Sequence, residues 1–134
     1  MAWLLAIGRW LLVMGHEMTL NMRDVLVRKM QKADLPRILQ LLADDELGQL
    51  RETVQVTPHD DYWRAFSPID ADPNQYMAVF EKDDRIISCL QISFIPGLSR
   101  RGALRGQIES VRVAANVRGN GYGTLMMAWA IEKC

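Results

Sequence analysis

The chain has 134 residues, a length that favours a single domain with a core of its own. Its 16 lysines and arginines balance its 16 aspartates and glutamates. This balance argues against general binding of nucleic acid or of a membrane surface, which usually requires a strong positive charge. Cys89 and Cys134 have neither the spacing of a metal site nor the number of a secreted disulfide scaffold. We therefore expect a cytoplasmic protein without a metal ion.

The N-terminal residues differ from the rest of the chain. The run from Trp3 to Met14 is almost entirely apolar. It is too short to span a bilayer, which takes about 20 apolar residues, and it lacks the basic region and cleavage site of a secretory signal. Three alternatives stay open: a short helix packed on the domain, an amphipathic helix at a membrane surface, or an extension outside the working protein. We favour the last, and assign residues 1–22 to an extension and residues 23–134 to the domain.

The first half of the domain predicts one strand and two helices. Alternating side chains predict a strand over residues 24–30. Apolar residues at helical spacing predict a helix over 31–43, and Pro36 is tolerated there only in the first turn. The polar segment 48–57 is expected to be a loop, and 58–69 a second helix.

Three strands and a last helix are expected in the second half. Two apolar runs around a short polar turn favour a hairpin. The expected elements are strands over 75–81 and 85–95, a basic loop over 98–105, a strand over 106–114 and a helix over 121–134. The predicted order is therefore β-α-α-β-β-β-α. It is a mixed α/β (α+β) fold, with helices on a largely antiparallel sheet.

The most informative segment is Arg118-Gly119-Asn120-Gly121-Tyr122-Gly123, which lies between an apolar strand and the last helix. Glycines let a backbone approach a ligand closely because they have no Cβ. The first N–H groups of a helix have no intrahelical partner and lie at the positive end of its dipole. Strand, glycine loop and helix together predict a site for a phosphate or diphosphate. A dinucleotide fingerprint would need glycine at Thr124, and a P-loop would need a lysine, so neither fits.

The pattern formed by Arg118, Gly121 and Gly123 after the strand Val111-Arg112-Val113 resembles the acyl-CoA-binding motif of the GNAT N-acyltransferase superfamily. The resemblance covers residues 25–134 and implies a GNAT-like fold with acetyl-CoA as co-substrate. The family continues past this helix with further strands, so the resemblance implies that its C-terminal strands are missing here. An unpaired edge on the strand 106–114 would invite pairing with another chain, which predicts a homodimer or aggregation.

Acyl transfer to an amine needs a proton acceptor, a donor to the thioester oxygen, and positioning of both reactants. Glu109 is the candidate base, since it is a carboxylate in an otherwise apolar strand that leads into the loop. We expect it to be buried, which would raise its pKa and make it a better proton acceptor. The alternative is a partly exposed residue paired with Arg101, Arg105 or Arg112.

The resemblance implies that strand and loop bind the coenzyme. In the family the equivalent strand bonds the pantetheine arm, and one of its N–H groups polarises the thioester carbonyl, a role that falls on Val113. Val111 and Val113 are expected to pack in the core as well. Arg118 either holds the diphosphate or only fixes the loop. The residues assigned to coenzyme binding are Val111, Arg112, Val113, Arg118, Gly119, Asn120, Gly121, Tyr122, Gly123 and Thr124.

Two other groups have alternative interpretations. An aromatic group that belongs either to the acceptor side or to the core is formed by Tyr62, Trp63 and Phe66. A basic group that either attracts an acidic acceptor or coenzyme phosphates, or is simply solvated, is formed by Arg100, Arg101 and Arg105. His59 is expected to be a polar residue at a helix start. Cys89 is expected to be a small buried hydrophobe.

These features predict an N-acyltransferase that moves an acyl group, in the first instance acetyl, from acyl-CoA to a primary amine of a small molecule, peptide or protein. The alternatives are a CoA-binding module without turnover and an inactive fragment. No nucleic acid partner is expected.

Overall fold

The computed structural model describes residues 24–134, so the predicted extension lies outside the described residues and the boundary at residue 22 stays a prediction. The strands are β1 (Leu26–Lys29), β2 (Gln75–Lys82), β3 (Arg85–Pro96) and β4 (Leu104–Val113). The helices are α2 (Leu35–Leu42), α3 (Glu46–Arg51), α4 (Asp60–Ala71), α5 (Ser99–Gly102) and α6 (Tyr122–Lys133), with 3₁₀ turns η2 (Lys32–Asp34) and η3 (Ala115–Val117).

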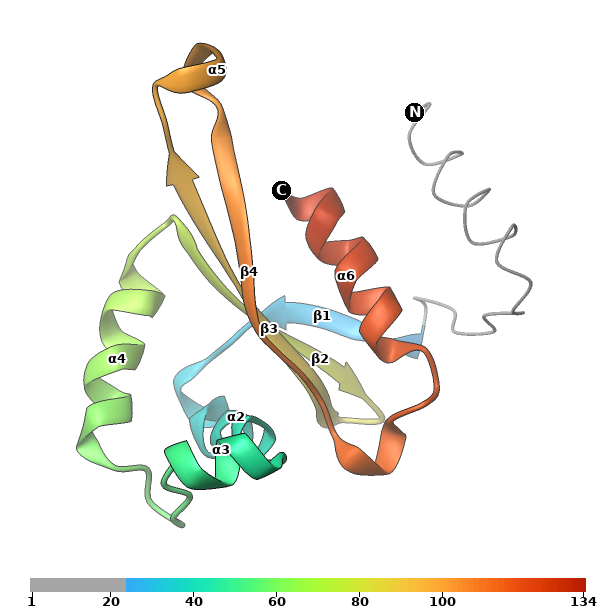
Figure 1. Cartoon of the computed structure of the whole chain (residues 1–134). Helices are drawn as coiled ribbons and strands as arrows, with labels where there is room; N and C mark the ends of the chain where they lie inside the picture. The colour runs from blue at the N-terminus through green and yellow to red at the C-terminus, as the bar shows by residue number, and fades with distance from the viewer. Residues whose placement is uncertain (1–23) are drawn as a thin grey trace.

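The strands form one sheet in the order β1-β2-β3-β4, and each neighbouring pair is antiparallel. Helix α6 lies on one face of the sheet, and α2 and α4 lie on the other (Figure 1). Phe80 and Leu90 of the sheet share one buried cluster with Met126 of α6, and Val79 shares the cluster on the opposite face with Leu39 of α2. The predicted α/β class with an antiparallel sheet is confirmed. Within residues 24–134, no helix has the length and apolar content needed to cross a lipid bilayer.

The β2–β3 hairpin turns over two residues, Asp83 and Asp84, between the paired residues Lys82 and Arg85. Both aspartates have positive φ, 49° and 59°, as a tight hairpin turn that matches the twist of the strands requires. Aspartate adopts this conformation more readily than most residues, because its short side chain bonds locally. The hairpin predicted at this position is confirmed.

The β3–β4 hairpin is the longest feature of the molecule, and it projects beyond the rest of the domain (Figure 1). Its tip is the short turn α5, in which Arg100 and Arg101 have φ values of 53° and 61°. The segment predicted as a basic loop is therefore partly a tight turn. Strand β4 begins at Leu104, two residues before the predicted start at 106.

The segment predicted as a loop over 48–57 contains a helix at its start, so that prediction is wrong for α3. The side chain of Asp45 accepts a hydrogen bond from the Gly48 amide at 2.5 Å and caps the helix. Such a cap satisfies one of the amides that a helix start leaves without a partner. The helix has only Leu47 and Leu50 as apolar residues, and both are exposed, so one such pair beside Gly48 is too weak a signal to predict it.

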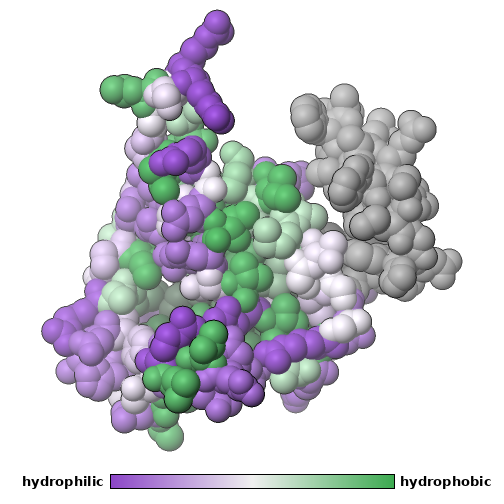
Figure 2. Space-filling view, viewed as in Figure 1, coloured by the Kyte–Doolittle hydropathy of each residue, from purple (hydrophilic) through white to green (hydrophobic). Residues whose placement is uncertain are grey.

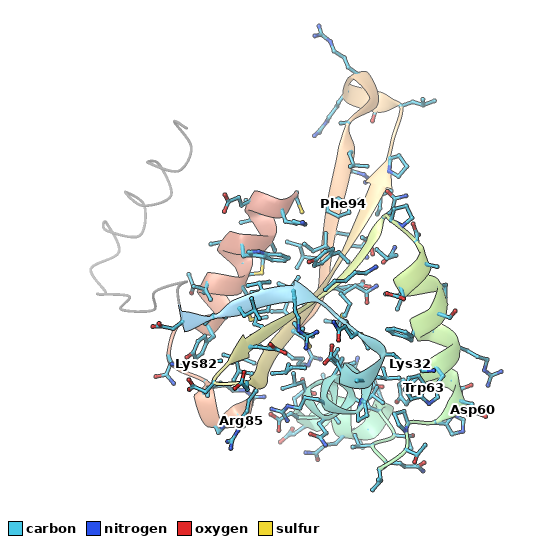
Figure 3. All side chains as sticks on the ribbon, turned by 180° about the vertical axis from the view of Figure 1, so that it is seen from behind. Lys32, Asp60, Trp63, Lys82, Arg85 and Phe94 are labelled. Atoms are coloured by element: carbon cyan, nitrogen blue, oxygen red, sulfur yellow. The ribbon has the colours of Figure 1, made fainter. Side chains whose placement is uncertain are left out.

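The two predicted helices of the first half are confirmed. Pro36 lies in the first turn of α2, where its missing N–H costs nothing. His59 caps α4, and its Nδ1 accepts from the Asp61 amide at 3.3 Å, which agrees with the role expected of it. The aromatic group Tyr62, Trp63 and Phe66 packs against the core between α2, α4 and the sheet. Lys32 lies over the Trp63 ring, 5.4 Å from its centroid (Figure 3).

Candidate functional site

The loop between η3 and α6 reaches the helix through two glycines in the left-handed region. Gly119 has φ 81° and Gly121 has φ 84°. A side chain at either position would cost roughly 1–2 kcal/mol, because Cβ would approach the following carbonyl oxygen. These glycines let the chain turn sharply into α6, so that the first amides of the helix face the loop.

The amides at the start of α6 have no helical partner. The first helical hydrogen bond that closes this turn runs from the Leu125 amide to the Gly121 oxygen, at 3.1 Å. The amides of Tyr122, Gly123 and Thr124 precede it, and together they form the positive end of the helix dipole. No side chain among residues 24–134 caps this end. The geometry suits an anion.

Gly123 lies beside space that the described residues leave open. Its φ is not in the left-handed region, and a Cβ added there would have no heavy atom of residues 24–134 within 4 Å outside its own turn. Helix Cα–Cβ bonds tilt toward the N-terminus, so this Cβ would project toward the mouth of α6. Glycine costs a helix roughly 1 kcal/mol relative to alanine. Among the described residues, neither backbone conformation nor packing requires a glycine at this position.

Asp44, which follows α2, holds the loop from the other side of the domain. Its Oδ2 accepts hydrogen bonds from the Ala115 amide and from Nη2 of Arg118, both at 3.1 Å. Arg118 also donates from Nε to the Val113 oxygen at 2.9 Å. The guanidinium of Arg118 is thus engaged within the protein, which favours the alternative that it fixes the loop. Asn120 adds a further brace, since its Nδ2 donates to the Val117 oxygen at 2.9 Å.

The strand before the loop offers its backbone at an open edge. Within residues 24–134, β4 pairs with β3 alone. The Ala114 amide bonds to Ile87 of β3, whereas the Val113 oxygen faces Arg118. Because N–H and C=O directions alternate along a strand, the amides of Val111 and Val113 point to the open edge. Their side chains pack against the core beneath α6, as expected. The predicted dimer through this edge stays a prediction.

A bulge in β4 sets the faces on which the candidate residues lie. Cys89 pairs with Arg112 and Gln91 with Glu109, so β4 has one residue more than β3 between these pairs. Ser110, at the bulge, has φ 54°. As a result Glu109 and Arg112 lie on the same face, opposite α6, although they are three residues apart. Bulges are frequent beside active sites because they redirect side chains.

Glu109 is exposed, which corrects the expectation that it is buried. Strand β4 lies at the edge of the sheet, and no helix of residues 24–134 covers its face at this point. The Nε2 of Gln107 donates to Glu109 Oε2 at 3.0 Å. Glu109 makes no ion pair with an arginine of the described residues, so the pairing considered as an alternative is absent there. Arg112 instead lies 3.4 Å from the carboxylate of Asp45.

The structure also shows the surroundings of three other residues considered in the sequence analysis, Tyr122, Thr124 and Cys89. The Tyr122 side chain is buried, and its hydroxyl accepts a hydrogen bond from Lys82 at 3.1 Å, so only its backbone amide faces the loop. Thr124 is exposed. Cys89 is fully buried, and desolvation raises the pKa of its thiol to about 12, although Arg112 and Arg37 act in the opposite sense. Such a thiol is a poor nucleophile.

Fold and loop together define the class: an α/β domain with an antiparallel sheet, in which a glycine loop leads from the edge strand β4 into α6. The chain matches the acetyltransferase (GNAT) family over residues 35–134. This chain belongs to that family. A comparison with curated proteins finds no significant match.

Solved structures of other proteins have the same fold. A transcriptional regulator from Bacillus halodurans C-125 is 37% identical, with a TM-score of 0.77 over 81% of this chain and 73% of that chain. The glucosamine-6-phosphate N-acetyltransferase of Arabidopsis thaliana is 24% identical, with a TM-score of 0.66 over 82% and 74%. A predicted acetyltransferase from Clostridium acetobutylicum, determined with acetyl-CoA, is 20% identical, with a TM-score of 0.62 over 81% and 72%.

Proposed function

We propose that this protein is an N-acyltransferase that transfers an acetyl group from acetyl-CoA to a primary amine. The observation that carries the proposal is the mouth of α6, where amides without helical partners adjoin the space left by Gly123. The diphosphate of coenzyme A is a dianion of suitable size for such a mouth. Membership of the acetyltransferase family supports this donor, and so does the Clostridium acetobutylicum structure, which was determined with acetyl-CoA.

The residues then have distinct roles. The amides of Gly119 to Thr124 bind the diphosphate, and Arg118, Asn120 and Asp44 hold the loop in place. The amides of Val111 and Val113 at the open edge of β4 bind the pantetheine arm and the thioester oxygen, on which negative charge develops. Such a donor contributes about 2.7–4 kcal/mol in other enzymes.

Glu109 accepts the proton of the attacking amine, directly or through a water molecule. The amine nitrogen forms a bond to the carbonyl carbon, and the C–S bond then breaks. The thiolate of coenzyme A leaves, and it takes up a proton from solvent. The face of the sheet opposite α6 is open at Glu109, which gives the amine a path to the reacting carbon that does not cross the coenzyme loop.

Release of thiol from acetyl-CoA tests this proposal. With a panel of primary amines, we expect thiol release that depends on both the amine and the protein, together with acetylated amine detected by mass spectrometry. Binding of CoA without thiol release from any amine would instead indicate a coenzyme-binding module. A site that binds CoA with a micromolar dissociation constant raises the free energy of unfolding by roughly 2.7 kcal/mol when CoA is present at about 100 times that constant. If CoA at this concentration gives no such increase, the coenzyme site itself is refuted.

A further inference from the structure

Three side chains of β4 form a row on one face of the sheet. Alternate residues of a strand share a face, so Arg105, Gln107 and Glu109 lie side by side. Their partners on β3 are Ile95, Ser93 and Gln91. The Cα atoms of Arg105 and Glu109 are four residues apart along the strand at about 3.3 Å each, which places them about 13 Å from each other. The row therefore leads from the proposed base to a cation near the tip of the hairpin.

The surface beside Gln107 and Glu109 is polar, although Ile95 lies beside Arg105 and the same face is apolar farther down. The Oε1 of Gln75 accepts hydrogen bonds from Nε2 of Gln91 at 3.0 Å and from the Ser93 hydroxyl at 2.9 Å. On this face beyond Gln91, toward the β2–β3 turn, Val79 and Cys89 pack in the core against α2. The hairpin thus presents ordered amide and hydroxyl groups where none of the described helices covers it. Such groups suit an elongated polar ligand.

The tip of the hairpin has a positive charge that its own residues do not balance. The chain contains no aspartate or glutamate between Asp84 and Glu109. Arg100, Arg101 and Arg105 are exposed, and they make no ion pair with any of residues 24–134. Figure 2 shows hydrophilic side chains on this projecting end with hydrophobic ones among them, and Leu98 of the same turn is exposed. The arginines of the tip create a local positive field that attracts anions, although the formal net charge of the whole chain is zero.

We infer that the acceptor has an anionic group about 13 Å from its reactive amine, and that Arg105 binds this group while Glu109 accepts the amine proton. This inference rests on the proposed function, and it adds the class of acceptor. An extended peptide suits the spacing. A carboxylate on its fourth residue lies at about this distance from the N-terminal amine. The β3 and β4 side chains between Arg105 and Glu109 then contact the intervening peptide backbone.

The test compares two peptides that are amidated at the C-terminus, have a free N-terminal amine and are otherwise neutral. One has glutamate at the fourth position, and the other has glutamine there. For the native protein with saturating acetyl-CoA, kcat/KM is expected to be about tenfold higher for the glutamate peptide, through KM. The preference falls with added salt, because the arginines are exposed.

Substitutions test whether the Arg105 side chain causes the preference for the glutamate peptide. Arg105→Gln abolishes the preference, while Arg105→Lys retains part of it. Arg85→Gln is the matched control. Arg85 is also exposed, but it lies at the β2–β3 turn, at the other end of the strand from the tip; Figure 3 shows it beside Lys82 and far from Phe94. This control retains the full preference.

The outcomes separate this inference from the function on which it rests. Equal use of the two peptides by the native protein, or equal loss of both in Arg105→Gln, overturns the anionic acceptor and leaves acetyl transfer intact. Failure of the native protein to bind CoA overturns the proposed function, and the inference with it.

Discussion

Replacement of Gly123 by alanine is expected to raise the dissociation constant of CoA at least tenfold, while the protein becomes no less stable. Tenfold corresponds to about 1.4 kcal/mol of binding free energy. The added methyl group would fill space at the mouth of α6 that contains no atom of the described residues and that the diphosphate needs. Stability is expected to rise by up to about 1 kcal/mol, because alanine favours the helix more than glycine does. Calorimetric titration and thermal unfolding measure the two effects.

Opposite signs for binding and stability make this variant informative. If a glycine serves only the fold, its substitution lowers the stability of the protein. We expect this result for Gly119→Ala, because φ of Gly119 is positive. The matched control is Gly97→Ala. Gly97 lies between β3 and α5, at the far end of the β3–β4 hairpin, and the nearest atom to an added Cβ, the Ala103 oxygen, is 3.6 Å away. This control is expected to bind CoA normally. A Gly123→Ala protein with an unchanged dissociation constant would remove the main support for the site.

Glu109→Gln is expected to lower kcat by a factor of about 10²–10⁴, the usual contribution of a positioned base. The dissociation constant of CoA is expected to stay the same, because Glu109 lies on the face opposite α6 and away from the loop. Glutamine has the shape of glutamate and can still accept a hydrogen bond from Gln107, so the fold is preserved. Steady-state kinetics and CoA titration of the same preparation measure the two quantities.

The pH profile separates a base from a residue that only positions the amine. The N-terminal amine of a peptide acceptor has a pKa of about 8. Without a base, the rate of the variant is expected to rise with pH toward that value, as more amine is already deprotonated, and to approach the rate of the native protein. Glu132→Gln is the control, since Glu132 is an exposed glutamate of α6 outside the site. A constant ratio of rates at every pH would show that Glu109 is not the base.

The sequence was sufficient for the elements whose signals are local. Residues 118–123 predicted the glycine turn into the last helix, and the short polar turn at 82–84 predicted the hairpin that Asp83 and Asp84 close. In each case the backbone conformation is dictated by the residues in the turn itself. The family resemblance added the arrangement of strands and the coenzyme.

The features that could not be predicted from the sequence depend on contacts between distant segments. Asp44 is 71 residues from Ala115 and 74 from Arg118, and nothing in its local sequence marks it as a ligand of the loop. The bulge at Ser110 is a mismatch of register between two strands, so one strand alone does not reveal it. Because the bulge decides the face of Glu109, exposure of that residue could not be anticipated from its apolar neighbours.

The central claim is that the main-chain amides at the start of α6 bind the diphosphate of coenzyme A. A ¹H–¹⁵N correlation spectrum recorded during titration with CoA tests it most directly, because it reports on each amide separately. We expect the largest shifts at residues 119–124, with smaller ones at Val111 and Val113, and little change in α4 or at the tip of the β3–β4 hairpin. Saturable CoA binding that leaves the amides of residues 119–124 unmoved, or no binding at all, would contradict the account.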